Sequence, residues 1–115
     1  MSITIYHNPR CSKSRQTLAL IEEKGITPNI IKYLDQGPDA KTLAQIIQQL
    51  GLNSAHDLLR TKEEEYKLAG LSPDSDDATV IAAMVKYPRL IERPIVVKGD
   101  KAVIGRPPES VLELL

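Results

Sequence analysis

The chain contains one cysteine, Cys11, within a stretch of polar and basic residues that could support thiol chemistry. It stands between a β-rich segment ending near Tyr6 and a helix that we expect to begin around Ser12. The first N–H groups of a helix lack intrahelical partners and carry partial positive charge, so they stabilise a thiolate and lower its pKa. The same N–H groups can bind an oxyanion. The position of Cys11 therefore predicts a thiol that is nucleophilic near neutral pH.

The neighbours of this cysteine are basic or polar. Arg10, Lys13 and Arg15 add positive charge, although we expect Lys13 to be solvated. His7 could donate a hydrogen bond to the thiolate or to a bound oxyanion, and Ser14 adds a hydroxyl. A free cysteine is most often a small buried hydrophobe. That alternative is disfavoured here because the flanking residues are not apolar.

The spacing Cys11-Ser12-Lys13-Ser14 is C-x-x-S rather than C-x-x-C. A dithiol pair can release a mixed disulfide by internal attack of its second thiolate, and a single thiol cannot. Any redox cycle through Cys11 therefore needs an external thiol.

Hydrophobic periodicity predicts the elements that position this segment, in the order β-α-β, several helices, β-β-α. We expect strands at 3–6 and 29–33, helices at 12–25, 40–50, 54–59, 62–69 and 76–87, a hairpin at 94–104 and a last helix from 107. The clearest helical periodicity is that of Leu43, Ile46, Ile47 and Leu50, which fall at i, i+3, i+4 and i+7. The apolar faces expected on the other helices are Leu18, Ala19 and Ile21; Ala55, Leu58 and Leu59; Val80, Ile81, Met84 and Val85; and Val111, Leu112 and Leu115.

A parallel βαβ unit and an antiparallel ββα unit can share one four-stranded mixed sheet. The expected fold is therefore α/β, of the thioredoxin or glutaredoxin type, as a single domain over 1–115 with a helical insertion at about 38–88.

The composition of the chain excludes several functional classes of protein. The 115 residues include 15 Lys and Arg and 15 Asp and Glu, so zero net charge gives no general attraction to nucleic acid or to a membrane surface. One cysteine and two histidines do not suffice for a structural zinc site. No signal peptide or membrane span is predicted, and a lone cysteine favours a reducing compartment. We expect a cytoplasmic protein with no metal and no bound cofactor.

Residues 6–15 resemble the active-site segment of the ArsC family, the glutaredoxin-dependent arsenate reductases. The family pattern H-N-P-x-C-x-x-S-R is matched at His7, Asn8, Pro9, Cys11, Ser14 and Arg15. Position 10 departs from well-known members, which carry a small residue there, and no role is assigned to Arg10.

The same family has three arginines around its oxyanion, and the resemblance covers essentially the whole chain. The matching residues are Arg60 after Leu58-Leu59, Arg93 before Pro94, and Arg106 before Pro107. Arginine forks bind tetrahedral oxyanions bidentately and stay charged at any relevant pH. Without the resemblance, Arg93 and Arg106 are stronger candidates for oxyanion binding than Arg60, because each stands beside a proline at a strand boundary.

The resemblance implies an arsenate reductase. Cys11 would attack arsenate, held by the three arginines, with His7, Asn8, Ser14, Arg15 and Pro94 supporting the site. Glutathione would be the co-substrate and glutaredoxin the protein partner. In thioredoxin-like folds the proline matching Pro94 has a cis peptide bond, so we predict a cis Arg93–Pro94 bond.

Two alternatives remain open on sequence. The first is a monothiol, glutathione-linked oxidoreductase acting on another substrate. The second is a regulator of the Spx type, which binds RNA polymerase. Redox-sensing regulators of that type use C-x-x-C in this segment, and Ser14 removes that switch here.

Overall fold

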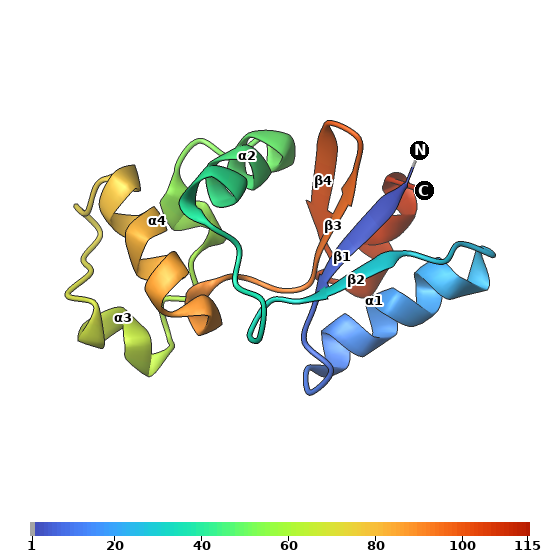
Figure 1. Ribbon diagram of the computed structural model, residues 1–115, viewed down its shortest axis with the longest axis horizontal. Helices are drawn as coiled ribbons and strands as arrows, with labels where there is room; N and C mark the ends of the chain where they lie inside the picture. Colours follow the sequence, from blue (N-terminus) through green and yellow to red (C-terminus); the bar gives the residue numbers. More distant parts are fainter. Residues whose placement is uncertain (1) are drawn as a thin grey trace. The chain divides into compact units, whose positions relative to one another are not determined.

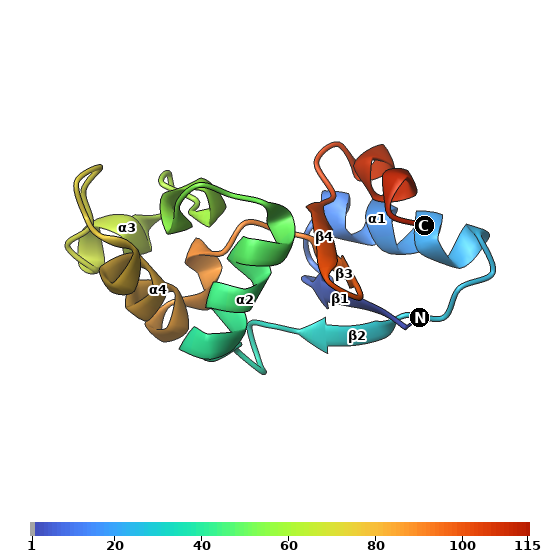
Figure 2. The same cartoon turned by 90° about the horizontal axis from the view of Figure 1, so that it is seen from above.

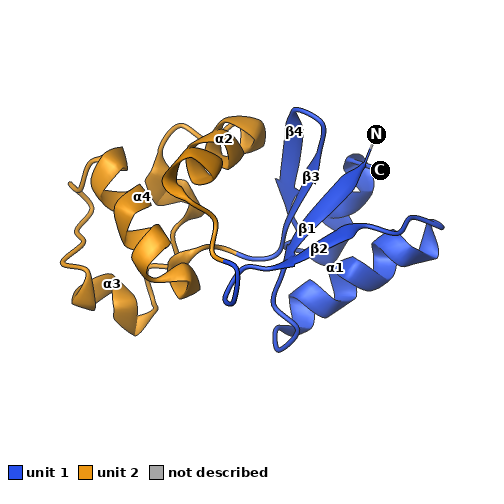
Figure 3. Cartoon of the chain, viewed as in Figure 1, with its two compact units in different colours: residues 1–36, 93–115 blue, residues 37–92 orange. Residues whose placement is uncertain are grey.

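The computed structural model describes residues 2–115, which form two compact units. Unit 1 combines the two ends of the chain, up to Gln36 and from Arg93 onward, and unit 2 comprises Gly37–Glu92 (Figure 3). Unit 2 includes the stretch of about 38–88 in which a helical insertion was expected, and it contains no β-strand among its described residues.

Unit 1 is built on a four-stranded mixed sheet (Figure 1). Its strands are β1 (Ile3–His7), β2 (Asn29–Lys32), β3 (Ile95–Lys98) and β4 (Lys101–Ile104), in the order β2-β1-β3-β4. β1 and β2 are parallel, whereas β1 with β3 and β3 with β4 are antiparallel. The predicted sheet of the thioredoxin type is therefore confirmed.

One face of this sheet is covered by α1 (Ser12–Glu23) and by a C-terminal 3₁₀ segment, η3 (Pro108–Glu113) (Figure 2). The core between them is aliphatic. Ile5, Ile21, Val96 and Val111 are each 0% exposed. As predicted, α1 ends before Gly25, whose positive φ of 76° suits a glycine after a helix.

The apolar faces in unit 1 differ from those expected. α1 buries Ser14, Thr17 and Ile21, while Ala19 is exposed. The last helix is 3₁₀ rather than α, and Leu112 is 41% exposed. With three residues per turn, neighbouring side chains point about 120° apart, so burial of Val111 turns Leu112 away from the core.

Unit 2 is helical. It contains α2 (Ala40–Leu50), η1 (Ala55–Leu58), α3 (Glu64–Leu68), α4 (Asp77–Lys86) and η2 (Pro88–Leu90). The side chains of Asp39, Ser54 and Asp76 each accept a hydrogen bond from a backbone N–H at a helix start. These caps explain where three of the helices begin.

Two expectations for unit 2 were wrong in detail. α3 is shorter than the predicted 62–69, and Val85 on α4 is 41% exposed. At 3.6 residues per turn Val85 lies about 140° around the helix from Val80, so the buried face passes through Ala83 and Met84 instead. Among residues 2–115, no helix is long and apolar enough to cross a membrane.

The central position of β1 yields a stability test. Ile5 is 0% exposed, and Ile30, its register partner on the edge strand β2, is 45% exposed. We expect Ile5→Ala to lower the free energy of unfolding by about 2–5 kcal/mol, because it leaves a cavity in the core. Ile30→Ala should cost less than about 1 kcal/mol. Urea denaturation of both variants measures the difference, and equal losses would contradict the assigned core.

Candidate functional site

Cys11 occupies the N-cap of α1, directly after the turn that leaves β1. Its N–H donates to the Asn8 carbonyl at 3.0 Å, and its own carbonyl accepts from the Arg15 N–H at 3.0 Å. The thiol is partly exposed. This is the strand–turn–helix position predicted from the sequence, and it places the sulfur where the first helical N–H groups can reach it.

The pKa of Cys11 is lower than that of an ordinary thiol. Burial alone would raise this pKa. The opposing effects are larger in sum: hydrogen bonds from the backbone N–H groups of Ser14 and Lys13, and both a hydrogen bond and the charge of Arg93. The thiolate is therefore favoured by α1 and by a cation from the far end of the chain.

Two arginines from the ββα half lie at the sulfur. Arg106 directs Nη2 to Cys11 Sγ at 3.6 Å and donates from Nε to the Arg93 carbonyl at 2.7 Å. Burial lowers the pKa of Arg93, but Tyr33 and Cys11 beside its guanidinium raise it overall, so Arg93 remains a cation. Both arginines were expected near an oxyanion, and unit 1 brings both to the thiol.

The basic side chains next to Cys11 in the sequence are not the ones that lower its pKa. The cation that lowers the pKa of the thiol is Arg93, not a basic neighbour in sequence. Arg15 donates from Nη1 to the Pro9 carbonyl at 2.8 Å, so it braces the turn. Arg10 and Lys13 are exposed. Arg93, by contrast, lies just before β3, the strand that pairs with β1.

His7 and Ser14 form a buried pair beneath the turn. His7 Nδ1 lies 2.7 Å from Ser14 Oγ, which also accepts from the Asn8 N–H at 3.1 Å. Burial, Lys32 and Arg15 lower the pKa of His7, so the ring is neutral. A neutral ring protonated on Nε2 satisfies both contacts. The sequence suggested a bond from His7 to the thiolate, but the contact found is with Ser14.

Asn8 completes this turn. It is 7% exposed, and its Oδ1 accepts from the Arg10 N–H at 3.0 Å. Together with the bond from Cys11 N–H to its carbonyl, this contact fixes the backbone before α1. The motif residues His7, Asn8, Ser14 and Arg15 therefore hold the turn in shape.

Pro94 and Gly105 form a close contact that the sequence did not reveal. The Arg93–Pro94 peptide bond is cis, as predicted, and so is Arg106–Pro107, which was not foreseen. The Gly105 N–H donates to the Pro94 carbonyl at 2.9 Å. A Cβ at Gly105 would lie 2.5 Å from Thr17 Oγ1 and 2.8 Å from Pro94 Cγ, so only glycine fits. The sole hint in the sequence was a glycine directly before Arg106.

Arg60 lies in unit 2, where it pairs with two carboxylates. Its Nε and Nη1 lie 3.3 Å from Glu63 and Glu92 carboxylate oxygens respectively, and its N–H donates to the Leu90 carbonyl at 2.7 Å. Arg60 and Glu63 are three residues apart in the segment between η1 and α3, so this ion pair is local but not helical. The site within unit 1 therefore comprises Cys11, Arg93 and Arg106.

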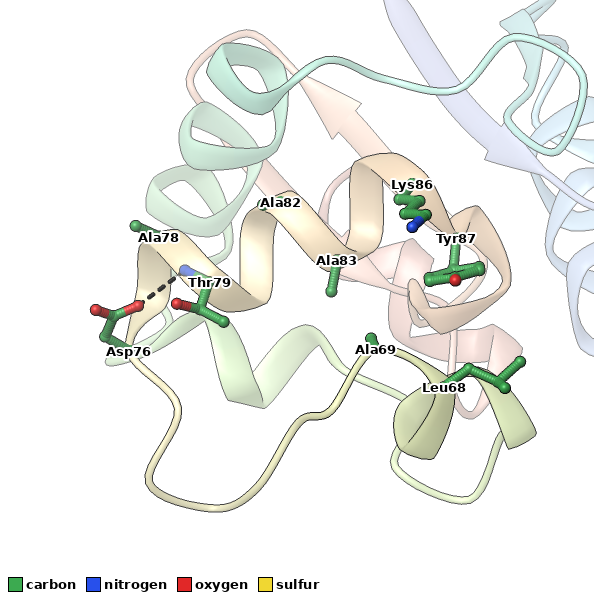
Figure 4. A pocket seen from close by; sticks show the side chains of 9 residues that line it. All are labelled: Leu68, Ala69, Asp76, Ala78, Thr79, Ala82, Ala83, Lys86 and Tyr87. Atoms are coloured by element: carbon green, nitrogen blue, oxygen red, sulfur yellow. Dashed lines mark hydrogen bonds between the residues drawn. The ribbon is translucent and has the colours of Figure 1, made fainter.

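Unit 2 also holds a cavity of about 520 Å³ between α3 and α4 (Figure 4). Its walls include Leu68, Ala82 and Ala83. The hydrogen bond drawn there is the cap of α4, in which the Thr79 N–H donates to Asp76 Oδ1. It contains no cysteine and no arginine. Within residues 2–115, no group of three or more His, Cys, Asp or Glu side chains could hold a metal ion.

A single thiol at a helix N-terminus, two guanidiniums beside it and a cis proline on this mixed sheet define a thioredoxin-fold protein with a monothiol site. Comparison with known proteins identifies the family. The model of the ArsC family matches residues 6–114, and the chain belongs to that family.

Three relatives show how close the likeness is. The protein named "Arsenate reductase" of Haemophilus influenzae is 51% identical over 116 residues, covering 100% of both chains. "Uncharacterized protein YfgD" of Escherichia coli strain K12 is 52% identical over 114 residues, covering 98% of this chain and 96% of that one. The solved "Arsenate reductase from Vibrio cholerae" superposes with a TM-score of 0.96 at 53% identity, covering 100% of this chain and 98% of that one.

The electrostatics of Cys11 predict a pH dependence. Because the thiolate is the charged form, a lowered pKa increases its fraction at neutral pH. Alkylation by iodoacetamide should therefore have its midpoint below the pH of about 8.5 typical of a free cysteine. Arg93→Gln should move the midpoint upward, because it removes both a hydrogen bond and a charge. Lys101→Gln on β4 removes a charge elsewhere in unit 1 and should leave it in place. A wild-type midpoint at the free-cysteine value would contradict the assigned environment.

Proposed function

We propose that this chain is an arsenate reductase that uses glutathione and glutaredoxin. The observation that carries the proposal is the convergence of Arg93 and Arg106 on a thiol whose pKa is lowered. The printed names of the relatives at 51% and 53% identity support arsenate as the substrate.

Arsenate is a tetrahedral oxyanion that carries between one and two negative charges near neutral pH. The N–H groups of Lys13 and Ser14 at the start of α1 and the guanidiniums of Arg93 and Arg106 are donors suited to its oxygens. The same donors would stabilise the charge that develops when the thiolate attacks arsenic. The family resemblance implies that Arg60 is a third oxyanion ligand, in which case its guanidinium would exchange the carboxylate of Glu63 or Glu92 for the substrate.

In the first step the Cys11 thiolate attacks arsenic(V). An S–As bond forms, an As–O bond breaks, and the oxygen leaves as water after protonation. In the second step a glutathione thiolate attacks the Cys11 sulfur. An S–S bond forms, the S–As bond breaks, and its electron pair stays on arsenic, which leaves as arsenite(III). Two thiols have then been oxidised to a mixed disulfide, which balances the two-electron reduction.

The third step returns the enzyme to its starting state. Ser14 has no thiol and is 0% exposed, so the mixed disulfide cannot be resolved internally. A glutaredoxin thiolate would attack the glutathione sulfur and release the Cys11 thiolate. This requirement for an external thiol follows from the C-x-x-S spacing.

The nucleophile is tested by arsenate reduction with glutathione and glutaredoxin. Cys11→Ser should abolish turnover, because a serine hydroxyl is neither ionised at neutral pH nor able to form the mixed disulfide. Thermal unfolding confirms that the variant is folded. Equal rates for the two proteins would overturn the proposal. Undetectable arsenate turnover by a wild-type protein that is readily glutathionylated at Cys11 would favour the monothiol oxidoreductase instead.

The anion site is tested by conservative substitution. Arg93→Lys and Arg106→Lys keep the charge but lose the bidentate fork. Each should lower kcat/KM for arsenate by about 10- to 100-fold, the value of one or two charge-assisted hydrogen bonds. Arg89→Lys is the matched control, since Arg89 pairs with Glu63 and Glu65 in unit 2 and should leave kcat/KM within about twofold. Wild-type values for both site variants would exclude them from substrate binding.

A further inference from the structure

Unit 1 has a cavity of about 330 Å³ that is lined in part by the turn before Cys11, at residues Asn8, Pro9 and Arg10. It lies at the carboxyl ends of β1 and β2, where His7 and Lys32 are register partners. The carboxyl ends of parallel strands are where ligands commonly bind in α/β folds. The cavity is large enough for a small organic molecule.

The lining of this cavity has a distinctive charge pattern. Two cations, Arg10 and Lys32, and one carboxylate, Asp35, stand around it. Leu34, 41% exposed, adds an apolar surface, and buried Asn8 contributes to the lining. A ligand with two negative charges and one positive charge would complement this set.

We propose that this cavity binds glutathione during the attack on Cys11. The inference rests on the proposed function, which makes glutathione the co-substrate. At neutral pH glutathione carries two carboxylates and one ammonium group, the complement of Arg10, Lys32 and Asp35. Arg10, which the family resemblance left without a role, thereby becomes a binding residue for the co-substrate.

The sheet order makes this placement suitable for the second step. Arg93 precedes β3 and Arg106 follows β4, whereas the cavity lies on the side of β2. Since the strands run β2-β1-β3-β4, the two sites flank opposite sides of the turn that follows β1. Attack on sulfur proceeds in line with the bond that breaks. Glutathione on the β2 side would therefore approach the Cys11 sulfur opposite arsenic on the β3 side.

The cavity is also joined to the nucleophile through the backbone. Asn8 lines the cavity, and its carbonyl accepts the Cys11 N–H at 3.0 Å. Arg10 directly precedes Cys11, so their Cα atoms are about 3.8 Å apart.

Two measurements test this site. The first titrates ¹⁵N-labelled protein with S-methylglutathione, which cannot react, and follows amide shifts. We expect shifts at Asn8, Arg10, Lys32 and Asp35. The second measures KM for glutathione and for arsenate in Lys32→Glu, with Lys101→Glu as the control for an equal change of charge elsewhere in unit 1. Lys32→Glu should raise KM for glutathione by about fivefold, the scale of one exposed charge pair, and change KM for arsenate less than twofold.

The outcomes separate the two proposals. Arsenate turnover with an unchanged KM for glutathione in Lys32→Glu, or shifts confined to other residues, would overturn the cavity assignment alone. A rise in KM for arsenate with no rise for glutathione would make the cavity an oxyanion site and overturn it as well. If the wild type turns over no arsenate, the proposed function fails, and the titration still decides whether S-methylglutathione binds in the cavity.

Discussion

The site in unit 1 depends on one electrostatic constraint, the stabilisation of a negative charge on Cys11. The amides of α1 approach the sulfur from one segment, and Arg93 and Arg106 approach it from another more than eighty residues later in the chain. Burial opposes ionisation of the thiol, so these donors must outweigh it. The mixed sheet brings the two segments together, because β3 pairs directly with β1.

The residues of the motif around the cysteine have different roles, which the sequence alone does not distinguish. Cys11 is exposed enough to react, while Ser14 and His7 are buried beneath it and bonded to each other. Arg15 and Asn8 bond to the turn itself. The motif therefore combines one reactive residue with a rigid support, which is how a reactive thiol is held in a fixed position against a substrate.

Local signals in the sequence were sufficient for the four-stranded mixed sheet, the start of α1 and the position of the helical segment between its two halves. They failed where contacts are long-range. The basic neighbours Arg10 and Arg15 looked like sources of the positive field, but Arg93 has that role, because the pairing of β3 with β1 brings it to the thiol. The fit of Gly105 against Thr17 and the contact of Tyr33 with Arg93 depend on chain segments that periodicity cannot bring together. Arg60 is held by carboxylates that its sequence neighbourhood only partly predicts, since Glu92 is remote.

The division of unit 1 between both chain ends has a consequence for biosynthesis. A ribosome completes Cys11 long before it reaches Arg93 and Arg106, and Gly37–Glu92 separates the two segments. Until the last strands join the sheet, the thiol lacks the guanidiniums that favour its ionised form. During synthesis the N–H groups of α1 are therefore available to the sulfur first, and the hydrogen bond and charge of Arg93 are added when the last strands join the sheet.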